Sequence, residues 1–266
     1  MPNDERQRPN ADAPEDDDAQ DAGPPADDDP LRVIRLMWEP PAPPRRGPRP
    51  KISLASVVEA GVRVADARGL DGLSMRVVAS ELGVGAMSLY TYVRSKTDLI
   101  EMMVDAVFAE RRPVDPEATW RDRLRSMAED DWAIYHRHPW LLETNLWRAS
   151  WGPNVLDATE ALYAALGAAG LAPRRIVEMS FVYEAFVQGA ARNSVVDAAS
   201  ERETGLGLTD YMTSRLGFFE TLFDSERFPM HVAIYQAGGF DEVESTFELA
   251  LAVLFEAVER LREDAV

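Results

Sequence analysis

Residues 77–99 of the chain read VVASELGVGAMSLYTYVRSKTDL, and their pattern is the most informative in the sequence. Ser74, just before it, is placed to cap a short helix that runs to about Leu82. Gly83-Val84-Gly85 then interrupts the helical pattern, and a second short helix is predicted over about Met87 to Val93. Two short helices joined by a glycine turn are typical of a helix-turn-helix unit.

Longer helices are predicted on both sides of this unit. Upstream, Ser53 is a plausible N-cap, apolar residues follow at helical spacing, and Gly69 supplies the stop. Downstream, Ser95-Lys96-Thr97-Asp98 resembles a capping box and starts a further apolar helix. The sequence therefore predicts a small helical bundle that ends near residue 108.

The remainder of the chain also reads as helical. Helices are predicted at about 118–138, 141–148, 153–169, 174–199, 209–224 and 242–264, with Pro139, Pro153, Pro173 and Pro229 at boundaries where proline is tolerated. The fourth and sixth of these helices carry long apolar stripes. No run alternates as a strand does over a useful length, so the predicted fold class is all-α.

The N-terminal segment differs in composition from the rest. Residues 1–30 hold 11 acids and 2 bases with almost no bulky apolar side chain, which predicts disorder. Residues 31–38 form an apolar island that suits either a docking strand or one turn of helix, and prolines 40, 41, 43 and 44 favour an extended chain. The predicted organisation is a tail over 1–44, a helix-turn-helix domain over 45–108 and a second all-α domain over 109–266.

The net charge of −18 argues at first sight against a nucleic-acid partner. The charge is uneven, however: residues 31–51 carry 6 bases and 1 acid, whereas residues 109–266 carry 15 bases and 27 acids. Arg45, Arg46, Arg49 and Lys51 fall in the basic segment, as either a DNA-contacting arm or a solvated linker. Nucleic acid is therefore not excluded.

Several function classes find no support in the sequence. The chain has no Cys and only three His, which argues against zinc sites, thiol catalysis and a multi-His metal site, and we expect no cofactor. No nucleophile elbow, metalloprotease, P-loop or dinucleotide motif is present, so an all-α enzyme is the weakest hypothesis. Without a signal peptide or membrane span, we expect a cytoplasmic protein with no membrane partner.

The motif Leu82-Gly83-Val84, followed by Ser88-Leu89-Tyr90, Tyr92-Val93 and Lys96, resembles the DNA-binding signature of the tetracycline-repressor (TetR/AcrR) family of bacterial transcription regulators. The resemblance is specific over residues 53–110 and looser in the C-terminal part. It implies double-stranded operator DNA as a partner and a drug-sensing all-α C-terminal domain. It also implies a homodimer through the helices at about 174–199 and 242–264.

Physical reasoning agrees with this resemblance for the second helix of the motif, whose first turn faces base edges in the major groove. Small residues let the backbone approach DNA, Met87 suits a thymine methyl group, and hydroxyls and ammonium groups suit phosphates. Tyr90 is alternatively half core, and Arg63 and Arg76 alternatively pair with acids. The predicted DNA-binding residues are Arg45, Arg46, Arg49, Lys51, Ser74, Gly85, Ala86, Met87, Ser88, Tyr90, Tyr92 and Lys96.

Five of the six tryptophans lie between residues 120 and 151, which suits either a pocket for a large, partly planar ligand or an ordinary helical core. The predicted ligand-binding residues are Trp132, His136, Trp140, Trp147, Trp151, Tyr183, Phe186, Gln188 and Asn193. Three His residues argue against a metal-assisted ligand site. The leading hypothesis is a repressor that binds a palindromic operator as a homodimer and is released by a small, largely apolar or aromatic effector. The alternative is a helix-turn-helix regulator without small-molecule control.

Overall fold

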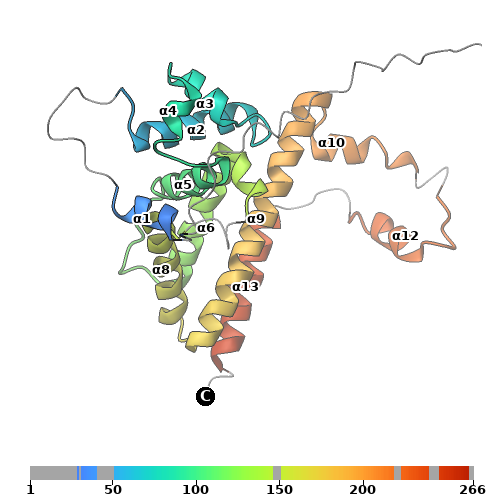
Figure 1. Cartoon of the computed structure of the whole chain (residues 1–266). Coiled ribbons are helices and arrows are strands. Elements are labelled where there is room, and N and C mark those ends of the chain that lie inside the picture. The colour runs from blue at the N-terminus through green and yellow to red at the C-terminus, as the bar shows by residue number, and fades with distance from the viewer. Residues whose placement is uncertain are drawn as a thin grey trace, which may run out of the picture.

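The computed structural model describes residues 29, 31–40, 51–145, 151–218, 223–239 and 246–263. Within these ranges every regular element is a helix, which confirms the all-α prediction. Figure 1 shows a small group of short helices packed on one end of a larger helical body.

The small group contains α2 (Leu54–Arg68), α3 (Met75–Glu81), α4 (Ala86–Leu89) and α5 (Lys96–Phe108). The side chains of Ser53, Ser74 and Ser95 each accept a hydrogen bond from the third residue of the helix that follows, as the sequence predicted. Gly83 has a φ of +66°, in the left-handed region, so the turn between α3 and α4 favours glycine there.

The larger body contains α6 (Trp120–Arg137), the 3-10 helix η2 (Pro139–Glu143), α8 (Pro153–Ala168), α9 (Pro173–Thr204) and α13 (Thr246–Glu263). Helices α9 and α13 are long and lie side by side (Figure 1). Two shorter helices, α10 (Leu208–Thr213) and α12 (Pro229–Gln236), project from the body. Pro139, Pro153, Pro173 and Pro229 each stand in the first turn of a helix, as predicted.

Four predicted segments differ from the structure. The helix expected at 141–148 is the 3-10 helix η2, whose backbone bonds join residues three apart, as in Leu141 N–H to the His138 carbonyl. The second helix of the helix-turn-helix unit, α4, was expected to reach Val93 but ends at Leu89. A turn follows, in which the Tyr92 N–H donates to the Leu89 carbonyl. Of the helix expected at 209–224, α10 covers 208–213 and residues 217 and 218 are also helical, whereas 219–222 lie outside the described residues; α12 was not predicted as a helix.

The fourth difference concerns the tail expected over residues 1–44. Its apolar island forms a helix, α1 (Arg32–Trp38), which packs on α5. Val33, Leu36 and Met37 are half-buried against the core. Residues 1–28, 30 and 41–50 lie outside the described part of the chain, so the expected disorder of residues 1–30 stays a prediction.

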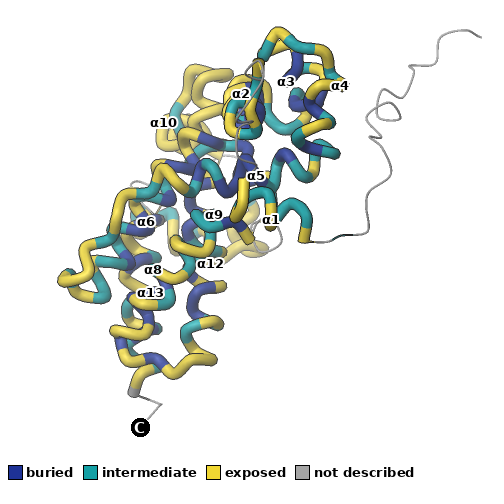
Figure 2. Tube along the Cα trace, turned by 60° about the vertical axis from the view of Figure 1, so that its left-hand side comes forward, coloured by how far each residue is buried: buried dark blue, intermediate teal, exposed yellow. Residues whose placement is uncertain are grey.

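Helix α5 joins the small group to the larger body. Its residues Leu99, Met103, Val104 and Val107 are at most 1% exposed, and it packs on both α2 and α8. In Figure 2 the buried residues of α5 continue into those of α2 and of the larger body. A single hydrophobic core therefore connects the two parts.

Candidate functional site

The predicted reading helix α4 presents its first turn to solvent. Met87 is 77% exposed, and Gly85 and Ser88 are also exposed, whereas Leu89 on the opposite face is fully buried. Ala86 and Tyr90 are half-buried and pack against the core, so Tyr90 is partly a core residue. An exposed methionine beside small residues offers a surface that can approach base edges.

Three polar residues predicted to contact DNA have partners within the chain. The Ser74 hydroxyl accepts from Val77 N–H and caps α3. The Tyr92 hydroxyl donates to the Ile52 carbonyl at 2.9 Å, and Lys96 Nζ donates to the Leu70 carbonyl at 2.8 Å. The Tyr92 phenol has a single O–H donor, and its bond to Ile52 uses it to hold the segment before α2. The Lys96 ammonium has three N–H donors, so two remain after its bond to Leu70.

The basic arm is only partly described. Lys51 is exposed, and Arg45, Arg46 and Arg49 lie outside the described residues. Arg63 was expected either to contact DNA or to pair with an acid. In the structure its Nε lies 3.5 Å from Glu81 Oε1, so it pairs with an acid.

A polar junction joins the small group to the larger body. Asp66 of α2 accepts a hydrogen bond from Trp140 Nε1 at 2.8 Å, and the same oxygen lies 2.7 Å from His138 Nδ1. Trp140 and His138 are 1% and 3% exposed. Trp140, predicted as a pocket residue, therefore contributes its polar atom to this junction.

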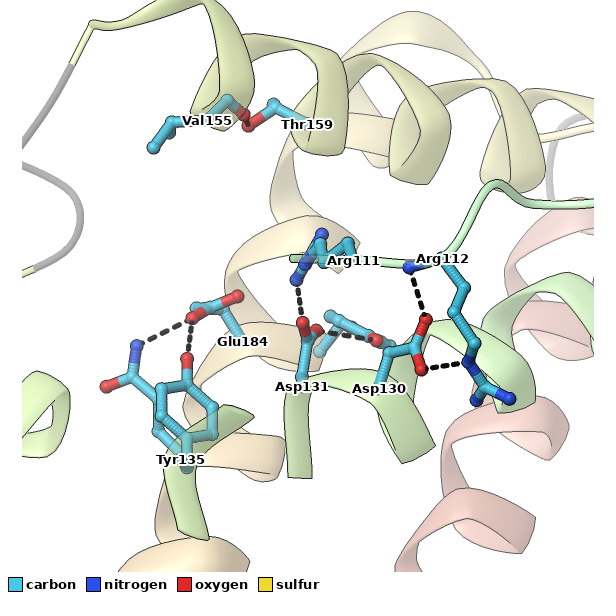
Figure 3. A network of polar contacts seen from close by, with 10 residues as sticks. Arg111, Arg112, Asp130, Asp131, Tyr135, Val155, Thr159 and Glu184 are labelled. Atoms are coloured by element: carbon cyan, nitrogen blue, oxygen red, sulfur yellow. Dashed lines mark hydrogen bonds and ion pairs between the residues drawn. The ribbon is translucent and has the colours of Figure 1, made fainter. Parts of the chain in front are cut away.

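A buried polar network crosses the larger body (Figure 3). Arg111, which follows α5, pairs with Asp131 of α6, and the Tyr183 hydroxyl of α9 donates to the same carboxylate at 3.1 Å. Burial raises the pKa of the Tyr183 hydroxyl, so it stays a hydrogen-bond donor. Removing one member would leave a buried charge or donor unpaired, which is costly.

A second part of the network lies beside the first. The Tyr135 hydroxyl and the Gln188 amide both donate to Glu184 Oε1 at 2.7 Å. Burial, and then the neighbouring Glu184 carboxylate, raise the pKa of Tyr135 well above its ordinary value. Two of the predicted ligand-binding residues, Tyr183 and Gln188, therefore belong to this polar network, and both lie on α9.

A cavity of about 230 Å³ opens between α5, α6 and α8. Phe108, Met127 and Ala158 are among its apolar walls, and Arg111 and Asp157 are among its polar ones. The buried Nε of Arg111 has no hydrogen-bond partner among the described residues. Eight of the nine predicted ligand-binding residues are described, and none of these eight lines this cavity.

The other predicted ligand-binding residues are dispersed. The Trp132 ring packs at a tilt against His136 and Phe247, with centroids 4.6 and 4.9 Å apart, and the Phe186 ring stacks on Phe247 at 6.3 Å. His136 is exposed and holds Ser194 Oγ at 2.9 Å.

The remaining three are not brought together by the structure. Trp151 is 60% exposed and Asn193 is exposed. Trp147 lies outside the described residues. The tryptophan-rich segment is therefore divided between an aromatic cluster, the junction and the surface.

The sequence analysis did not predict that Arg111, Asp131 and Glu184 belong to the buried polar network. The only local signal was the pair of arginines before Pro113, directly after an apolar helix. Nothing in the sequence shows that α6 and α9 bring acids to them.

Comparison with known proteins assigns the family. The profile for bacterial regulatory proteins of the tetR family matches residues 57–103, and the profile described as tetracyclin repressor-like, C-terminal domain, matches residues 112–262. The chain belongs to the TetR family of DNA-binding transcriptional regulators, which are not enzymes.

Two relatives and one solved structure illustrate the likeness. The chain is 38% identical over 208 residues to the HTH-type transcriptional repressor DrrR1 of Streptomyces coeruleorubidus, covering 76% of each. It is 31% identical over 191 residues to an HTH-type transcriptional regulator of Saccharopolyspora erythraea, covering 71% of this chain and 80% of the relative. Apo ActR from Streptomyces coelicolor shares the fold, with a TM-score of 0.69 and 22% identity over 82% of this chain and all of that one.

The described residues contain neither a membrane-spanning helix nor a metal-binding group. None of their helices is long and apolar enough to cross a bilayer. No group of three or more His, Asp or Glu side chains among them is arranged to hold a metal ion.

Proposed function

We propose that the protein is a repressor that binds a palindromic operator as a homodimer and is released by a small-molecule effector. The observation that carries this proposal is the junction at Asp66. It ties the small group of helices α2–α5, which we call the reading head, to the larger body through His138 and Trp140. A change in the body can reach α2, and through it α4, because the buried side chains of His138 and Trp140 both contact the same oxygen of Asp66. The head then spans about 45–108 and the sensor about 109–266, in a cytoplasmic protein.

The exposed first turn of α4 supports DNA reading. The side chains of Met87 and Ser88 are exposed to solvent, so they can enter the major groove of DNA. Lys96, at the start of α5, lies where the helix N-terminus and its own charge favour a phosphate. Lys51 and the adjoining arginines add contacts that carry no sequence information.

The dimer is supported by apolar residues left exposed on the two long helices. Phe181 and Val182 of α9 are 46% and 51% exposed, and Leu249 and Val253 of α13 are 65% and 56% exposed. Such residues on adjacent helices indicate a surface covered by another chain. A two-fold dimer also matches the symmetry of a palindromic operator.

The effector site we propose is the cavity between α5, α6 and α8. Apolar walls with a few polar groups suit a small aromatic molecule, and the unpartnered Nε–H of Arg111 favours a carbonyl or carboxylate on it. A ligand here would touch Arg111, and through Asp131 the buried network of α6 and α9. Solved structures of ActR, which shares this fold, include one in complex with actinorhodin.

Operator selection from random DNA, followed by a binding titration, tests this function. We expect a selected site with two-fold symmetry, bound by one dimer, and at least one aromatic compound that lowers its affinity. The variants Phe181→Glu and Leu249→Glu should give monomers that bind the site weakly, whereas Leu156→Glu on α8 serves as the control. A symmetric site that no bound compound weakens would favour the second candidate, a regulator without small-molecule control.

A further inference from the structure

Helix α1 lies outside both matched family regions, yet it is fastened to the protein at each end (Figure 1). Arg32 Nη1 donates to Asp98 Oδ2 at 3.1 Å, which ties the start of α1 to α5. Trp38 Nε1 donates to the backbone carbonyl of Trp151 at 2.9 Å, which ties its end to the segment before α8. The helix is therefore held between parts of the chain that are distant in sequence.

A cavity of about 250 Å³ lies under α1. Leu36 and Met37 of α1 form one wall, and α2 contributes Ala55 and Glu59 among others. Asp105 of α5 and Asn154 of α8 lie among the remaining lining residues, most of which are apolar. This cavity is separate from the one proposed for the effector, although Asn154 borders both.

The polar lining of this cavity is acidic. Among the described residues it contains two carboxyl groups, Glu59 and Asp105, and no lysine or arginine. Asp105 is 5% exposed and fixed in place, because it accepts from the backbone N–H of Asn154 and Val155 at 3.0 Å and from Asn154 Nδ2 at 2.9 Å. Glu59 is exposed, so its charge stands in contact with solvent.

We infer that the cavity under α1 binds a compact aryl-alkyl amine, with the ring against the apolar walls and the ammonium group toward Glu59 and Asp105. Apolar burial supplies affinity, and the carboxylates select a cation over a neutral molecule of the same shape. Helix α1 forms one wall of the cavity through Leu36 and Met37, so the proposed site depends on this N-terminal helix.

Calorimetric titration of the full-length protein with 2-phenylethylamine, and with 2-phenylethanol as its neutral counterpart, tests the inference. We expect the amine to bind and the alcohol to bind at least about fivefold more weakly. Glu59→Gln should weaken amine binding by about fivefold, whereas Glu117→Gln, which removes an exposed charge elsewhere, should not. Ala55→Phe should fill the cavity and weaken binding by about tenfold or more, whereas Ala67→Phe on the same helix should not.

Ala158→Phe, in the cavity proposed for the effector, should leave amine binding unchanged, so the two proposals fail separately. No heat of binding with the amine at millimolar concentration would overturn the inference. Equal affinity for the amine and the alcohol would also overturn it. So would a result in which Ala158→Phe weakens amine binding and Ala55→Phe does not. Both Ala55 and Ala67 are exposed, and Glu59→Gln keeps the test decisive if Ala55→Phe does not fold.

Discussion

Asp66 of helix α2 and Trp140 of helix η2 are joined by a hydrogen bond of 2.8 Å between the carboxylate Oδ1 and the indole Nε1. The two residues come from the small group of helices and from the larger body, and the indole is 1% exposed. We expect this buried indole to help fix how the small group of helices is oriented on the larger body. The first prediction follows from that bond.

Trp140→Phe keeps an aromatic ring in the core but removes the donor to Asp66. We expect a loss of about 1–2 kcal/mol in the free energy of unfolding, since Asp66 loses the hydrogen bond from a buried indole. We also expect weaker operator binding, because the head is less firmly oriented. Trp151→Phe, at a residue 60% exposed, is the control and should change neither quantity. Equal effects of the two substitutions would mean that the bond does not orient the head.

Met87→Ala tests the reading helix. The side chain is 77% exposed, so thermal stability should hardly change. Loss of its apolar contact should cost about 1–3 kcal/mol of discrimination against the wrong base, with little effect on random DNA. Competition binding with operator and scrambled duplexes measures the difference. Ser80→Ala, at an exposed position of α3, is the matched control. A reduction shared equally by both duplexes would show that Met87 does not read bases.

Lys96→Gln tests whether this ammonium group contacts phosphate. Its Nζ already donates to the Leu70 carbonyl, but two donors remain. If it also meets phosphate, the slope of log K against log salt should fall in magnitude by about 0.9. Tyr92→Phe removes the neutral hydroxyl bonded to Ile52 and should leave this slope unchanged. An unaltered slope in Lys96→Gln would restrict the lysine to its bond with Leu70.

Gly152→Ala tests the packing at the start of α8. A Cβ at this position would lie 2.2 Å from the Asp105 carboxyl, although the φ of −74° suits any residue. We expect a loss of about 1–3 kcal/mol in stability, and a much smaller loss when Asp105→Ala is already present. Gly189→Ala, in open space within α9, should be neutral or stabilising. Additive effects of Gly152→Ala and Asp105→Ala in denaturant unfolding would contradict the predicted clash.

Local signals explain why the head could be predicted from the sequence. The serine caps at 53, 74 and 95 and the glycine at 83 act on their immediate neighbours, so the helix starts and the turn are confirmed. The all-α class and the proline boundaries follow from the same kind of local information. Helix α1 could not be decided, because eight residues fit a strand or a helix equally until α5 is there to pack against.

The sensor was harder because its site depends on tertiary contacts. The clustering of tryptophans suggested one pocket, but Trp140 faces Asp66 and Trp132 faces Phe247, each on a different element. Conversely, Arg111, Asp131 and Tyr183 are far apart in the sequence and meet only when α6 and α9 pack. Side chains that meet across helices leave no spacing pattern to read.

Ala158→Phe tests whether an effector bound in the cavity between α5, α6 and α8 releases the operator. Fluorescence anisotropy of the selected operator is followed while an effector found by thermal-shift screening is added to the wild type, to Ala158→Phe and to the exposed control Ala164→Phe. We predict that all three bind the operator, that the wild type and Ala164→Phe release it, and that Ala158→Phe stays bound. Release of all three at the same effector concentration would contradict the account.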